Sequence, residues 1–120
     1  MLLVIFVTGC SLVGTDNGYI NGHVEPNHPT YIVVLESRED LHRFTHYSAY
    51  GCDFPDCGVY ASPKDGSWEM SIKGNNDYYI FGIVDVNRNM KLDDPDDIIW
   101  PRKGNPIYVP EQEIICVSLY

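Results

Sequence analysis

The sequence is short of positive charge. Its 120 residues include 8 Lys and Arg against 17 Asp and Glu, which gives a formal net charge of −9 at pH 7. Nucleic acids and anionic membrane surfaces attract proteins mainly through Lys and Arg, so neither is expected to bind this chain electrostatically. The excess of acids instead favours divalent cations. We therefore exclude nucleic-acid binding from the candidate functions.

The sequence also lacks the common catalytic motifs. It contains no Gly-x-Ser-x-Gly elbow, no P-loop and no His-Glu-x-x-His sequence. Acids are plentiful, but they are concentrated in predicted turns, where acidic side chains are usually solvated. The sequence therefore predicts a protein that is not an enzyme.

No apolar run is long enough to cross a membrane, which takes about 20 residues. The run Leu2–Val7 ends in Val-Thr-Gly-Cys at Cys10, and this resembles a bacterial lipobox. The resemblance implies that residues 1–9 are a signal peptide, that Cys10 carries lipid, and that residues 11–17 are a tether. The protein would then be anchored in the bacterial cell envelope, at the outer membrane or the periplasmic face. The alternative is a first β-strand with a buried cysteine.

Cysteine is scarce, with four residues in all. Cys52 and Cys57 enclose the short loop CDFPDC, and in an oxidising compartment this favours a disulfide that stabilises by about 2 kcal/mol. Free thiols are one alternative. Another is a zinc site with His42 and His46, although their spacing matches no common zinc module. Cys116 lies in an apolar stretch and is expected to be a small buried residue.

The chain does contain many short strands. Residues 67–73 (SWEMSIK) alternate apolar and polar side chains, which predicts a half-buried strand. The Lys-Asp-Gly turn before it predicts that residues 59–62 form the partner strand of a hairpin. Further strands are predicted at residues 18–24, 31–36, 78–84, 98–100, 105–109 and 113–120. About seven strands predict one all-β domain over residues 18–120, a β-sandwich with an insertion at residues 37–57.

Only the insertion contains a helical pattern. Ser37 is a typical N-cap residue, and Asp40 follows three positions later, as in a capping box. Leu41, Phe44 and Tyr47 then recur at three-residue spacing. The predicted helix ends near residue 51, where glycine is a natural stop.

The order of these motifs resembles a known family. Gly-His-Val at 22–24, an apolar strand, and KDGSWEMSIKGNNDYYIFGIVDVNRN at 64–89 resemble the carboxypeptidase regulatory-like, or transthyretin-like, domain over residues 18–119. The resemblance implies a prealbumin-like sandwich that serves envelope and secreted proteins as a non-catalytic module. A hydrolase branch of that fold ends its last strand in Tyr-Arg-Gly-Ser, whereas residues 117–120 here are Val-Ser-Leu-Tyr.

Residues 85–96 (DVNRNMKLDDPD) have an acid or an amide at almost every second position. Calcium loops of the EF-hand type draw oxygen ligands from positions 1, 3, 5, 7, 9 and 12. These positions hold Asp85, Asn87, Asn89, the Lys91 carbonyl, Asp93 and Asp96.

Two features of this loop depart from the calcium pattern, and one is that Asp96 at position 12 is shorter than the glutamate that usually closes the site. The other is that Met90 occupies position 6, usually glycine, where a left-handed backbone would cost it about 1 to 2 kcal/mol. The alternative to a calcium site is a run of Asx-turns, in which the side chains cap their own backbone and Arg88 and Lys91 offset part of the charge. A bound calcium ion would be structural and weak, on a scale of about 0.1 to 1 mM.

Three tyrosines flank the insertion: Tyr47, Tyr50 and Tyr60. Exposed together, they would form a surface for sugars or a partner protein. The predicted function is a non-catalytic, lipid-anchored envelope protein, a structural or interaction module with a calcium loop. The alternatives are a carbohydrate- or protein-binding module that uses these tyrosines, for an envelope glycan or protein partner, and a zinc-dependent enzyme.

Overall fold

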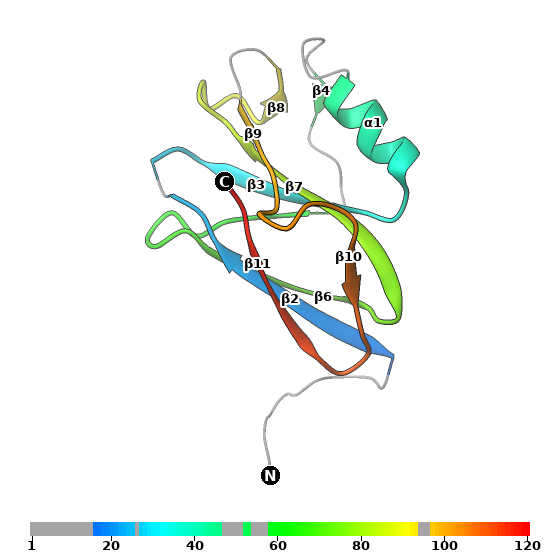
Figure 1. Ribbon diagram of the computed structural model, residues 1–120. Helices are drawn as coiled ribbons and strands as arrows, with labels where there is room; N and C mark the ends of the chain where they lie inside the picture. The colour runs from blue at the N-terminus through cyan, green and yellow to red at the C-terminus, as the bar shows by residue number, and fades with distance from the viewer. Residues whose placement is uncertain (1–15, 26, 47–51, 54–57, 94–96) are drawn as a thin grey trace.

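The computed structural model describes residues 16–25, 27–46, 52–53, 58–93 and 97–120 (Figure 1), with only the backbone described at residues 46, 52 and 53. This part of the chain is predominantly β. In chain order its elements are β2 (Asn17–His23), β3 (Thr30–Leu35), α1 (Arg38–His46), β4 (Cys52–Asp53), β5 (Gly58–Tyr60), β6 (Ser67–Lys73), β7 (Asn76–Val84), β8 (Lys91–Leu92), β9 (Asp97–Ile99), β10 (Ile107–Val109) and β11 (Ile114–Ser118).

The strands form two main sheets. The larger sheet has the order β10-β7-β3-β5, and β9 pairs with the second half of β7. The smaller sheet has the order β11-β2-β6, in which β11 runs parallel to β2. All other pairs are antiparallel, including the short pair of β4 with β8. The all-β prediction is confirmed, with more strands than the seven expected.

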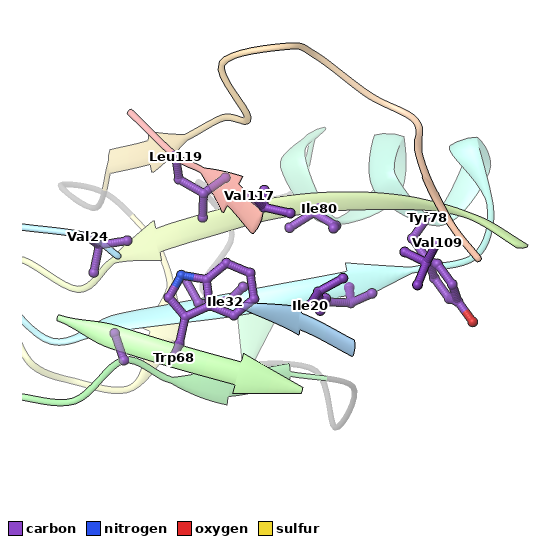
Figure 2. Packing of buried hydrophobic residues seen from close by; sticks show 11 residues of the cluster. Ile20, Val24, Ile32, Trp68, Tyr78, Ile80, Val109, Val117 and Leu119 are labelled. Atoms are coloured by element: carbon purple, nitrogen blue, oxygen red, sulfur yellow. The ribbon is translucent and has the colours of Figure 1, made fainter. Parts of the chain in front are cut away.

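Two hydrophobic clusters hold the layers together. The first lies between the two sheets and includes Ile20, Ile32, Trp68 and Val117, as Figure 2 shows. The second lies on the opposite face of the larger sheet, where α1 covers residues such as Phe81. Strands β3 and β7 are therefore buried on both faces, which explains why their sequences are almost continuously apolar.

The helix begins as the sequence predicts. The Ser37 hydroxyl accepts a hydrogen bond from the Asp40 backbone N–H at 3.1 Å, so the N-cap is confirmed. Leu41 and Phe44 pack against the second cluster. The predicted end of the helix lies outside the described residues. No helix in the described ranges is long and apolar enough to span a membrane.

The predicted hairpin of residues 59–62 with residues 67–73 is wrong. Strand β5 pairs with β3, and β6 pairs with β2 in the other sheet. The turn itself is present, because the Gly66 N–H donates to the Ser62 carbonyl at 2.8 Å and Gly66 has a φ of +76°. A Cβ on Gly66 would lie 1.9 Å from the Val24 carbonyl oxygen. This turn therefore carries the chain from one sheet to the other rather than closing a hairpin.

Cys116 corrects a second prediction. It is exposed on the outer face of the smaller sheet, not buried. The reason is the two-residue period of the strand, since Ile115, Val117 and Leu119 face the first cluster and Cys116 must face the other way. The same alternation in the sequence predicts that these three residues point inward, and the structure confirms it.

Candidate cation loop and the adjoining Tyr60 pocket

The predicted calcium loop begins at Asp85, directly after β7. Asp85 is only 1% exposed, and its carboxylate accepts hydrogen bonds from the backbone N–H groups of Asn89 (3.2 Å) and Met90 (2.9 Å). Its own N–H donates to the Pro29 carbonyl at 2.8 Å. The loop is therefore wound around a buried carboxylate, which satisfies two backbone donors that would otherwise lack partners.

Two residues of the loop have left-handed backbones. Arg88 has a φ of 58° and Met90 a φ of 63°. For residues with a Cβ this conformation costs about 1 to 2 kcal/mol, and the hydrogen bonds to Asp85 offset part of that cost. Met90 thus adopts the backbone that glycine usually supplies at position 6 of a calcium loop. Its side chain is 60% exposed and adds little packing.

The side chains at positions 3, 5 and 9 converge. The Asn87 amide donates to one Asp93 carboxylate oxygen at 3.2 Å, and the Asn89 amide donates to the other at 2.5 Å. The Asn89 side-chain oxygen accepts the Lys91 N–H at 3.1 Å. Asp96 lies outside the described residues. Three of the five predicted ligand side chains therefore lie together, with the amides of Asn87 and Asn89 donating to the Asp93 carboxylate.

These oxygens suit a hard cation such as calcium, which prefers carboxylate and amide ligands. Within the described ranges no three His, Cys, Asp or Glu side chains gather into a metal-binding cluster, so asparagine oxygens would supply the remainder. Each Asp85 oxygen accepts one N–H and retains a second lone pair. The Asx-turn alternative also predicts side-chain to backbone hydrogen bonds of this kind. The donor set fits calcium, and calcium binding stays a prediction.

A cavity of about 450 Å³ adjoins the loop, and we call it the Tyr60 pocket. Residues at the start of β3 and at the end of β5 contribute to it, together with Arg88 from the loop. Its lining includes Val24, His28, Thr30, Tyr60, Ala61 and Arg88.

Tyr60 is the one predicted binding tyrosine whose surroundings the structure describes. Its ring contacts Tyr31 edge to face, with 4.9 Å between ring centroids and 71° between ring planes. Partial burial, and then the negative charge of Asp85, raise the pKa of the Tyr60 phenol. The Asp85 carboxylate thus lies close enough to Tyr60 to act on its phenol, and the Arg88 guanidinium supplies the opposite charge at the pocket wall.

Several predicted site residues lie outside the described residues: Cys10, Tyr47, Tyr50 and Cys57, together with the side chains of His46 and Cys52. Lipidation, the disulfide and the zinc alternative therefore stay predictions. His42 is described, and it lines a separate groove between α1 and Trp100.

The sequence analysis did not identify His28 and Arg88 as pocket residues. They could have been identified by assuming that the two most apolar strands, β3 and β7, pair with each other. Antiparallel pairing of β3 with β7 places Thr30 opposite Val84, so the residues before β3 must lie beside the loop after β7.

The chain matches no known family model, no curated protein and no solved structure. The chemistry of the loop and the pocket is therefore the basis on which a function can be assigned.

Proposed function

We propose that this protein is a non-catalytic interaction module of the bacterial cell envelope, whose loop at residues 85–96 binds a structural calcium ion. The observation that carries the proposal is the convergence of Asn87 and Asn89 on Asp93, in a turn wound around Asp85. The resemblance to carboxypeptidase regulatory-like domains supports the non-catalytic role and a prealbumin-like sandwich, extended by additional short strands.

Calcium would be held by the side chains of Asp85, Asn87, Asn89, Asp93 and Asp96 and by the Lys91 carbonyl. The ion supplies positive charge, which offsets the repulsion among these carboxylates. It would also fix the connection from β7 to β8, because Lys91 is the first residue of β8. The role is structural, since the loop presents no group that the sequence motifs associate with catalysis.

Calorimetric titration with calcium tests this proposal. We expect a Kd of about 0.1 to 1 mM, and at ten times the Kd a gain in stability of about 1.4 kcal/mol. Asp93→Asn should abolish the heat and the gain. Asp77→Asn is the matched control, because Asp77 is an exposed acid of β7 outside the loop. No heat and the same melting temperature in calcium and in chelator would show that the loop is only a solvated turn.

Lipid anchoring has its own test. Expressed in a Gram-negative host with its native N-terminus, the protein should have an intact mass that corresponds to cleavage before Cys10 and addition of three acyl chains. Cys10→Ser should give an unmodified, uncleaved product. The proposed anchor is wrong if the native sequence gives that same unmodified product.

A second candidate function is binding of a glycan or a protein partner through exposed aromatic residues. The observation that favours it is that Tyr60, 36% exposed, lines a cavity. The test is whether Tyr60→Ala removes binding of a sugar while the protein remains folded.

A further inference from the structure

We propose that the Tyr60 pocket binds a small acidic sugar, with the ligand carboxylate on Arg88 and the sugar ring against Tyr60. This inference rests on the second candidate function and does not require calcium in the loop.

Arg88 is the group that selects an anion. Its guanidinium has no hydrogen-bond or ion-pair partner among the residues that the structure describes, although acids outnumber basic residues 17 to 8. Its backbone is fixed, because its N–H donates to the Asp85 carbonyl at 3.3 Å and its φ is 58°. The planar fork of arginine binds a carboxylate through two parallel hydrogen bonds. An arginine held in this way at a pocket wall favours a carboxylate ligand.

Tyr60 provides the surface for a ring. Its contact with Tyr31 holds the aromatic plane at a fixed angle, and Tyr31 itself is buried in the second cluster. An amphipathic aromatic ring with one polar end suits the mixed surface of a pyranose, whose C–H groups pack on it while its hydroxyls remain hydrogen-bonded.

The remaining lining explains why a sugar fits better than a purely apolar acid. Asn27 and His28 are polar and come from the segment just before β3, and the polar residue Thr30 begins that strand. The Thr30 hydroxyl donates to the His28 carbonyl at 3.2 Å, which leaves its oxygen able to accept from a ligand hydroxyl. Val24 and Ala61 add apolar area. The volume of about 450 Å³ lies within the usual range for small-molecule sites.

The protein offers its own spectroscopic reporters, because it has only two tryptophans. Trp68 lines a second hollow that shares Tyr60 with the pocket. Figure 2 shows its indole nitrogen on the side of the ring that faces Val24. Trp100 lies in the separate groove beside α1. A ligand in the Tyr60 pocket should therefore move the indole N–H resonance of Trp68 and leave that of Trp100 in place.

The experiment is a titration followed by ¹H–¹⁵N correlation spectra, with glucuronate as the probe, glucose as the neutral sugar and benzoate as the non-sugar acid. Each titration is run in calcium and in chelator. We expect glucuronate to shift the Trp68 indole resonance and the backbone resonances of Thr30 and Arg88. Arg88→Gln should weaken binding about tenfold or more. Lys64→Gln removes the same charge from an exposed residue outside both the calcium loop and the pocket lining, and it should change binding by less than about twofold.

Each other outcome overturns the inference. Equal binding of glucose would retain the second candidate function but remove the role of Arg88. Equal or tighter binding of benzoate would show a site for organic acids, not sugars. Equal losses in the two variants would indicate a general charge effect. No shift with glucuronate up to its solubility limit would exclude an acidic sugar in this pocket, whatever the calcium titration shows.

Discussion

Met90→Gly should stabilise the protein, although it shortens an apolar side chain. Met90 has a φ of 63°, and this left-handed backbone costs a residue with a Cβ about 1 to 2 kcal/mol. Glycine avoids that cost but loses about 0.5 to 1 kcal/mol through its freer unfolded chain. Because the side chain is 60% exposed, its removal sacrifices little burial. The expected net gain is about 0.5 to 1 kcal/mol.

Urea unfolding measures this gain, and thermal melting should show a rise of roughly 2 to 6 °C. Met90→Ala is the matched control, because alanine removes the side chain but retains the strained backbone. Met90→Gly should also tighten calcium binding, since glycine is the usual residue at position 6. If Met90→Gly is no more stable than Met90→Ala, the backbone strain assigned to this position is absent and the reasoning fails.

Gly104→Ala should cost about 1 to 2 kcal/mol in urea unfolding, because Gly104 has a φ of +82° and open space around it. Gly66→Ala should cost clearly more, since it adds a backbone clash at 1.9 Å to a similar φ; equal costs would contradict this. Asp85→Ala should destabilise by about 2 to 4 kcal/mol, because two loop N–H groups lose their acceptor; a smaller loss in urea unfolding would mean that other groups or water satisfy them. The backbone N–H of Ser67, and then its hydroxyl, lower the pKa of Asp65. Its contribution to stability is therefore present above the unfolded value and lost as the pH falls through the lower folded value. An NMR titration that finds Asp65 at or above the usual aspartate value would refute this, and Ser67→Ala should reduce the shift without removing it.

The features of the fold that depend on local spacing could be predicted from the sequence. The inward residues of β11 follow from two-residue alternation, and the Ser37 cap follows from a side chain that reaches only three residues ahead. The partner of β5 could not be predicted. A turn ending in Gly66 reverses the chain, but it does not determine whether the next strand joins the same sheet. Here the turn passes over Val24 and delivers β6 to the other sheet.

In the candidate site, too, the local contacts could be predicted from the sequence and the long-range ones could not. The hydrogen bonds of the loop connect Asp85 to backbone N–H groups four and five positions later. These contacts are local in sequence, so the spacing of the residues is enough to predict a turn closed on Asp85. The Tyr60 pocket combines Val24, Tyr60 and Arg88, which are far apart in the chain. Their proximity depends on strand pairing, and no local pattern encodes it.

The parallel pairing of β11 with β2 has a consequence for how the chain folds. Tyr19 and Ile114 lie opposite one another, although nearly the whole sequence separates them. The ribosome releases β2 long before β11, so β2 lacks its parallel partner until β11 has emerged. Until then Val117 and Leu119 are missing from the first cluster, and Ile20 and Trp68 lack part of their cover. Contacts between residues so far apart in sequence form slowly, and the incomplete chain is prone to aggregation until they have formed. We therefore expect the domain to fold only after its last strand has emerged, with a dependence on chaperones that hold the unfinished chain.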